Sequence, residues 1–190
     1  MIVSSELWLL KILLKGRNNF VVVNNFLIAN NFCISDKYFL RSLSKSNDYT
    51  ETYVETSTGR VLVAHTGQEI TNNKPVIITY HDLGLNYISN YQAFFNYPDF
   101  REIASGFPIF HINAPGQEDG AATLAGDYEY PSMEQLAEQV QEVLNHFKIV
   151  KYIGIGVGLG ANVLTRHALS YPERVECMML VNTCTTKVIN

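Results

Sequence analysis

The stretch Gly156-Val157-Gly158-Leu159-Gly160-Ala161 is the part of the chain best suited to positioning a reactive group. An apolar run precedes it and residues at helical spacing follow it, which predicts a strand, a sharp turn and a helix. Two chemistries use this geometry. A nucleophile elbow, G-x-S-x-G, lifts a serine above a sheet. A dinucleotide-binding turn, G-x-G-x-x-G/A, points a helix N-terminus at a pyrophosphate. The stretch partly matches both motifs, so the rest of the sequence must decide between the two interpretations.

The position of the turn in the chain favours the elbow. A dinucleotide-binding turn normally follows the first strand and is followed about 20 residues later by an acid for the ribose. Here the turn follows the fifth predicted strand, and the next strand ends in residues 181–187 without an acid. In hydrolases with an elbow, the helix ends in a turn like Pro172-Glu173-Arg174-Val175, and counting back places Gly158 at the nucleophile position. Glycine has no nucleophile to activate, so we expect an elbow without catalysis, vestigial at Gly156, Gly158 and Gly160.

Polar residues near the other predicted strand ends give weaker signals. The His-Gly pair that shapes the oxyanion hole of such hydrolases reads His81-Asp82 here, and a carboxylate would oppose a developing oxyanion. We expect His81, Asp82 and His111 to line a pocket, with structural hydrogen bonding the favoured role of both histidines. An acid–base site formed by Asp82 with Glu118 and Asp119 is the less favoured alternative to solvated loop carboxylates.

The remaining candidates are expected to be structural. A lone histidine is more often a structural or surface residue than a catalyst, which is the interpretation of His65, His146 and His167. A triad acid and histidine would follow later strands, and because the sequence stops at Asn190 we expect neither in this chain. The sequence therefore predicts no catalytic, cofactor-binding or metal-binding residue.

The elements that must position the glycine turn form a regular alternation from residue 48 onward. Strands are predicted over 48–56, 60–66, 74–80, 107–113, 152–157 and 175–182. A short helix begins near Ser89 and is interrupted by Pro98, and a second runs from Asp99 to Ser105. Ser132 and Gln135 form a capping box that begins a longer helix. An opening hairpin followed by alternating strands and helices predicts an α/β fold with a largely parallel sheet.

Composition excludes some classes of function. The chain has 47% hydrophobic and 17% charged residues and a net charge of −4, with no basic block, so we expect a globular domain that binds no nucleic acid. The three cysteines, Cys33, Cys177 and Cys184, show no metal-ligand spacing and favour a reducing, cytoplasmic location. Cys184 follows the sixth strand, where an inert thiol is favoured because no activating base is evident.

Residues 1–47 differ from the domain predicted over 48–190. Their apolar runs are too short for a transmembrane segment, and no signal-peptide pattern is present. The favoured interpretation is an atypical extension, disordered or loosely docked. The second interpretation is an amphipathic tether that gives weak membrane association.

Four stretches together resemble the N-myc downstream-regulated (NDRG) family: residues 74–82, 114–122, 130–137 and 154–161. The resemblance implies an α/β-hydrolase fold without catalytic residues, no cofactor, and a cytoplasmic protein that acts through protein partners in signalling, differentiation or stress response. Compared with the family pattern, the chain looks truncated: its helical cap and last two strands are missing. The sixth strand is therefore expected to be an unprotected sheet edge.

Two alternatives to this non-catalytic function stay open. One is a residual hydrolase or small-molecule binder that uses the pocket near His81 and Asp82 with an unconventional nucleophile. The other is a truncated product without independent function, which the atypical N-terminus and the exposed sixth strand motivate. The identity of any protein partner is not readable from the sequence.

Overall fold

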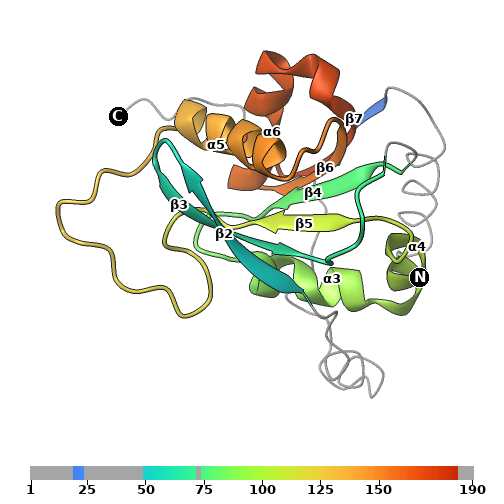
Figure 1. The fold of residues 1–190 in the computed structure, drawn as a ribbon, viewed down its shortest axis with the longest axis horizontal. Helices are drawn as coiled ribbons and strands as arrows, with labels where there is room; N and C mark the ends of the chain where they lie inside the picture. The colour runs from blue at the N-terminus through green and yellow to red at the C-terminus, as the bar shows by residue number, and fades with distance from the viewer. Residues whose placement is uncertain (1–18, 24–48, 72–73, 184–190) are drawn as a thin grey trace.

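A single mixed sheet organises the computed structural model, which describes residues 19–23, 49–71 and 74–183 (Figure 1). Its strands lie in the order β1-β7-β6-β4-β5-β3-β2. Their bounds are β1 Asn19–Val23, β2 Thr50–Thr56, β3 Gly59–His65, β4 Val76–Tyr80, β5 Ile109–Ile112, β6 Tyr152–Val157 and β7 Val175–Val181. The opening hairpin β2–β3 and the β3–β5 pair are antiparallel, and all other pairs are parallel. The predicted α/β fold is confirmed.

Helices cover both faces of the sheet. One face carries α5 (Met133–His146) and α6 (Leu159–Ser170), and the other carries η1 (Ile88–Gln92), α3 (Ala93–Asn96) and α4 (Pro98–Ala104) (Figure 1). A three-residue helix, η2 (Pro172–Arg174), leads into β7. Alternate residues of β4 divide between two cores: Val76, Ile78 and Tyr80 pack with α5 and α6, and Ile77 packs with the aromatic side chains opposite. This division explains the continuous apolar sequence of β4, since a strand buried on both faces has no polar side.

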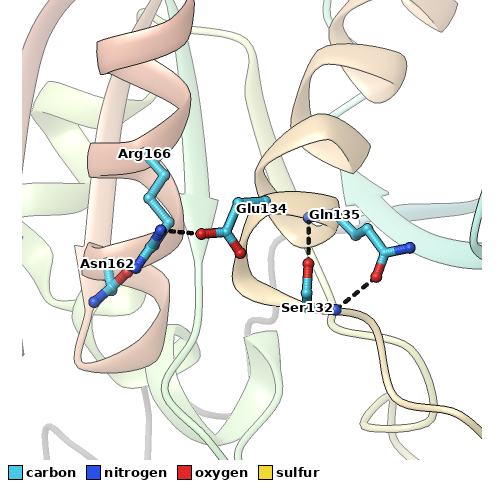
Figure 2. A network of polar contacts seen from close by, with 5 residues as sticks. All are labelled: Ser132, Glu134, Gln135, Asn162 and Arg166. Atoms are coloured by element: carbon cyan, nitrogen blue, oxygen red, sulfur yellow. Dashed lines mark hydrogen bonds and ion pairs between the residues drawn. The ribbon is translucent and has the colours of Figure 1, made fainter. Parts of the chain in front are cut away.

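The start of α5 follows its sequence signal. Ser132 Oγ accepts from the Gln135 N–H (3.2 Å), and the Gln135 side chain accepts from the Ser132 N–H (2.7 Å), so the predicted capping box is formed (Figure 2). In the same first turn, Glu134 pairs with Arg166 of α6, and Arg166 Nε donates to Asn162 Oδ1 (2.8 Å; Figure 2). The pair is partly exposed and contributes little by itself, so it mainly fixes how the two helices meet.

The first crossover between strands differs from a simple helix. Its first turn, η1, is a π-helix that continues directly into α3, and Pro98 occupies the first turn of α4. The proline lacks the N–H that would bond within a helix, so it ends one helix and begins the next. The predicted interruption at Pro98 is therefore confirmed, while the π-helical start had no signal in the sequence.

The expectation of an open edge at the sixth predicted strand is wrong. That strand is β7, and β1 pairs with it in parallel from Asn19↔Cys177 to Val23↔Val181, which gives seven strands instead of about six. β1 lies within the segment 1–47 that was expected to be a separate extension. Residues 1–18 and 24–47 of that segment, with Cys33, lie outside the described residues, so their proposed roles stay predictions. Among the described residues, no helix is both long and apolar enough to cross a membrane.

Candidate functional site

The glycine turn joins β6 directly to α6. Val157 ends the strand, Gly158 adopts φ +52° and ψ −111°, and the helix begins at Leu159. The Gly158 N–H donates to the carbonyl oxygen of Val181 in β7 (2.9 Å). A residue with a side chain would be strained at this positive φ, whereas glycine adopts it readily. The predicted strand, sharp turn and helix are therefore all present.

Gly156 and Gly160 allow the helix to approach the sheet closely. A Cβ on Gly156 would lie 2.7 Å from the Cα and N of Ala161, and a Cβ on Gly160 would lie 1.9 Å from the carbonyl oxygen of Tyr80. These contacts are to backbone atoms, which do not move aside as a flexible side chain does. The two glycines thus set the distance between the first turn of α6 and strands β6 and β4.

The carboxylate of Asp82 fills the space above the turn. Its Oδ1 accepts from the Leu83 N–H (2.8 Å) and from the Leu159 N–H at the start of α6 (2.8 Å). A Cβ built on Gly158 would lie only 2.0 Å from this oxygen. The partial positive charge at a helix N-terminus stabilises a carboxylate in this position. The two amides that face the turn are therefore already bound to an anionic oxygen of the same chain.

His81 connects two loops through both ring nitrogens. Its Nε2 lies 2.8 Å from the Ala114 N, and its Nδ1 lies 2.7 Å from the Asp82 carbonyl oxygen. An amide only donates and a carbonyl only accepts, so Nε2 carries the lone pair and Nδ1 carries the proton. Burial lowers the pKa of His81, which keeps the ring neutral. With both ring nitrogens bound to backbone groups, His81 holds the loop after β4 to the start of the loop after β5. These two bonds support the structural role that was favoured for His81.

His111 lies in an aromatic environment on the α3 side of the sheet. Its Nδ1 is 2.7 Å from Thr79 Oγ1. The rings packed around it belong to Tyr49, Tyr87, Tyr91 and Phe95, with centroids 4.8 to 5.8 Å away. Burial lowers the pKa of His111 to about 3, so the ring stays neutral. The structure thus brings His81 and Asp82 together, whereas His111 contacts Thr79 and these rings.

His167 belongs to a buried hydrogen-bond chain that sequence reasoning did not anticipate in detail. Its Nδ1 meets the Tyr152 hydroxyl (2.8 Å), and its Nε2 meets Gln141 Oε1 (3.1 Å). The amide of Gln141 donates to Asn145 (3.2 Å), which also accepts from Arg174 (2.8 Å). Burial, together with the charge of Arg174, lowers the pKa of His167 to about 4. This series of hydrogen bonds joins β6, α6, α5 and η2, so it stabilises the packing of these elements.

The other candidates lie on other elements of the structure. Glu118 and Asp119 lie in the loop after β5; Glu118 forms a backbone turn with Ala121 (3.1 Å), and Asp119 is exposed. Their convergence with Asp82 stays a prediction. Cys177 is buried in β7, where burial raises the pKa of its thiol, and Cys184 lies outside the described residues. Among the described residues, no group of three or more side chains is arranged to hold a metal ion.

Two residues near the turn were missed by sequence reasoning. Asn90 Oδ1 accepts from the Asp82 N–H (3.0 Å), and the Tyr91 hydroxyl lies 2.6 Å from the carbonyl oxygen of Tyr80 and 3.0 Å from that of Ile155. Both come from the π-helix η1, and both are buried. π-Helical turns occur frequently at functional sites, but a single sequence carries no reliable signal for them.

Solved structures with a similar fold include hydrolases. The naproxen esterase of Bacillus subtilis is 19% identical with a TM-score of 0.53, over 74% of this chain and 46% of the esterase. The N-acyl homoserine lactonase AidH is 24% identical with a TM-score of 0.54, over 70% of this chain and 45% of the lactonase. At this level of identity the likeness shows the fold alone, and it confirms the predicted α/β-hydrolase architecture.

Sequence comparison is more specific. Protein NDRG3 of Xenopus laevis is 46% identical over 135 residues, which cover 71% of this chain and 36% of that protein. Protein NDRG4 of Xenopus tropicalis is 47% identical over 135 residues, covering 71% and 33%. This chain thus spans about a third of the length of the curated relatives that it matches. The model of the Ndr family matches residues 51–189, and the chain belongs to the Ndr family.

Proposed function

We propose that this protein is a non-catalytic member of the α/β-hydrolase fold that acts through protein–protein contacts in intracellular signalling, differentiation or stress response. One observation carries the proposal: the Asp82 carboxylate occupies the space above Gly158 and accepts both amide hydrogen bonds there. In an active hydrolase of this fold, a nucleophile and an oxyanion use the equivalent space. Gly156, Gly158 and Gly160 are then a vestigial elbow.

The electrostatics of the turn support the absence of acyl transfer. An oxyanion hole accelerates the reaction because its donors are unoccupied and meet charge as it develops. Here the Leu83 and Leu159 amides already meet a carboxylate oxygen, so a second anion would be repelled as well as unbonded. His81 could not serve as a base without giving up its bond to Ala114, because its proton-accepting nitrogen holds that amide.

Exposed apolar side chains near the same end of the sheet support a contact function. Leu83 is 70% exposed in the loop after β4, and Tyr130 is 74% exposed in the loop after β5. That second loop also carries Glu118, Asp119, Asp127 and Glu129 without a basic residue. A surface of this kind suits a protein partner, and the family resemblance is the ground for proposing a cytoplasmic location.

The first test is an assay of the full chain for catalysis. We expect no turnover of p-nitrophenyl acetate or butyrate and no labelling by a fluorophosphonate probe. Activity that co-purifies with the chain and is lost in Asp82→Asn would contradict the proposal, and it would favour the alternative of a residual hydrolase near His81 and Asp82.

The second test addresses the contact function. We expect Leu83→Ser to reduce recovery of cross-linked partners from cells at least about threefold, as measured by quantitative mass spectrometry. Leu169→Ser is the matched control, because Leu169 is 78% exposed at the far end of α6. Both variants should keep the wild-type free energy of unfolding, since exposed side chains contribute little to it. Equal recovery with both variants and wild type would remove this surface from the proposal.

A further inference from the structure

The loop after β5 contains an aspartate that is followed directly by a glycine. This loop runs from residue 113 to residue 132, and Figure 1 shows it extending away from the sheet. Asp119-Gly120 is the one place in the sequence where an aspartate or an asparagine precedes a glycine. Both residues are exposed. The pair therefore meets solvent in a kind of segment where changes to the main chain are well tolerated.

The two residues occupy the centre of a tight turn. The Ala121 N–H donates to the Glu118 carbonyl oxygen (3.1 Å), and Gly120 has φ +71°. A positive φ at the third residue of a turn favours glycine, because a side chain there would crowd the main chain. A Cβ built on Gly120 would meet no atom within 4 Å. The space beside the Gly120 Cα is therefore open to solvent.

Neither polar group of the pair is held by another part of the chain that the structure describes. Within residues 19–23, 49–71 and 74–183, the Asp119 carboxylate has no hydrogen bond or ion pair, and the Gly120 N–H donates to no acceptor. Asp82 differs in both respects, since its Oδ1 accepts two amide hydrogen bonds and a leucine follows it. The Asp119 side chain and the Gly120 nitrogen are thus free to approach each other.

We propose that Asp119-Gly120 is a site of spontaneous isomerisation, at which the folded protein converts aspartate to isoaspartate. The Gly120 nitrogen forms a bond to Asp119 Cγ, and one carboxyl oxygen leaves with two protons as water, which closes a five-membered succinimide ring. Water then adds back to the ring. Breaking the new bond restores aspartate. Breaking the bond between the Gly120 nitrogen and the main-chain carbonyl carbon of Asp119 gives isoaspartate, with the main chain running through Cγ and the α-carboxylate as the side group.

Glycine at position 120 is what makes the ring closure accessible. The attacking nitrogen must come close to Cγ, and a side chain on residue 120 would crowd this approach. The product carries one extra main-chain carbon inside the turn. Gln117 Oε1 accepts from the Gly84 N–H (2.8 Å) and holds the loop just before the turn, so the change is passed to the residues that follow. Isomerisation at this pair goes beyond the proposed contact function and does not rest on it, because the ring closes without a partner.

The test uses the full chain, kept folded for several weeks at neutral pH and physiological temperature. Electron-transfer mass spectrometry of its peptides locates isoaspartate. The amount is measured as labelled methyl groups that an isoaspartyl methyltransferase transfers from S-adenosylmethionine to the new carboxylate. We expect at least about tenfold more isoaspartate at Asp119 than at Asp127, an exposed aspartate of the same loop that precedes a tyrosine.

Three variants isolate the two groups that react. Asp119→Glu should abolish the signal, because its longer side chain would have to close a six-membered ring, which forms far more slowly. Gly120→Ala should lower the rate at least about fivefold by crowding the attacking nitrogen. Gly126→Ala is the matched control, since it makes the same substitution in the same loop and leaves the pair intact. It should keep the wild-type rate.

Three results would overturn the proposal. Equal amounts of isoaspartate at Asp119 and Asp127 would show that the pair is not reactive in the folded loop. Isoaspartate that forms at Asp119 only in urea would show that the fold suppresses the step. Equal rates in Gly120→Ala and Gly126→Ala would remove the glycine from the explanation. Ester turnover and partner recovery, measured on fresh protein, report separately on the proposed function.

Discussion

The connections that follow β6 and β5, the two neighbours of β4 in the sheet, differ in length and in packing. After β6 the chain turns into α6 through Gly158 alone, whereas after β5 it runs from residue 113 to residue 132 before α5 begins. The first connection is packed so closely that added Cβ atoms would collide with backbone. The second is largely exposed, and a Cβ on Gly120 or Gly126 would meet nothing within 4 Å. At the turn, where hydrolases of this fold carry their nucleophile, Asp82 fills the space above Gly158, whereas the neighbouring loop after β5 is exposed.

The difference lies in how closely each connection is packed against the rest of the chain. The short turn still presents two amides, but Asp82 occupies them with an oxygen from the loop after β4. The long loop is pinned to the same place at its start, because the Ala114 N–H donates to His81 and Gln117 Oε1 accepts from the Gly84 N–H (2.8 Å). Close packing is therefore found at the turn and at the start of the long loop, and the later part of that loop is more exposed.

The strongest challenge to this comparison is Gly160→Ala. The new Cβ would lie 1.9 Å from the Tyr80 carbonyl oxygen, so α6 must move away from β4. We expect a loss of more than about 4 kcal/mol in the free energy of unfolding, measured by urea denaturation, or no folded protein at all. Gly126→Ala in the long loop is the control and should change stability by less than about 0.5 kcal/mol. Similar losses from the two substitutions would mean that the two connections are not different in packing.

Acid should lower the free energy of unfolding through the buried histidines of the packed part of the molecule. His111 and His167 have pKa values lowered to about 3 and about 4 by burial, against about 6.5 in an unfolded chain. The unfolded state therefore takes up their protons first as the pH falls below 6.5, and stability that is fully present above this pH is lost. From pH 7 to pH 5.5 we expect the two groups together to lower the free energy of unfolding by about 2.5 kcal/mol.

The same experiment bears on His81, whose pKa is also lowered by burial. Protonation of its Nε2 would break the bond to the Ala114 amide and release the start of the long loop. Urea denaturation at pH 7, 6 and 5.5 gives the slope. An equal free energy of unfolding at all three pH values would contradict the lowered pKa values of these buried histidines.

Ser132→Ala tests the far end of the long loop, where α5 begins. The substitution removes the acceptor for the Gln135 N–H, and we expect a loss of about 1 kcal/mol, the usual value for an N-cap. The double variant with Gln135→Ala should lose less than the sum of the two single variants, since the two bonds form one capping box. Strict additivity in urea denaturation would show that the box does not act as a unit.

Features that depend on neighbouring residues were predictable from the sequence. Strands β4 and β6, the capping box at Ser132 and the interruption at Pro98 were all expected, because apolar runs, S-x-x-Q and proline act locally. The glycine turn was expected for the same reason. Its conflict with Asp82 was anticipated only as repulsion of an oxyanion, whereas the structure shows that the carboxylate itself holds the two amides.

Features that depend on distant partners were not predictable. The pairing of His81 with Ala114 and the carbonyl bridge by Tyr91 require strands to be placed first, and backbone amides leave no mark on residue type. β1 was missed because its short apolar run between asparagines gains a partner only in β7, far along the chain. The edge of β7 was therefore expected to be open because its pairing with β1 is a non-local contact.

The place of β1 in the sheet also sets the order of events during synthesis. The partner of Phe20, Met178, is translated about 158 residues after it. At ~5–20 residues per second this is a delay of roughly 8 to 30 seconds. Throughout that interval the β-branched segment has no β7 to pair with, so it is available to chaperones or to other nascent chains. Among the described strands, β1 is thus translated before all others but can pair only after β7 has been made.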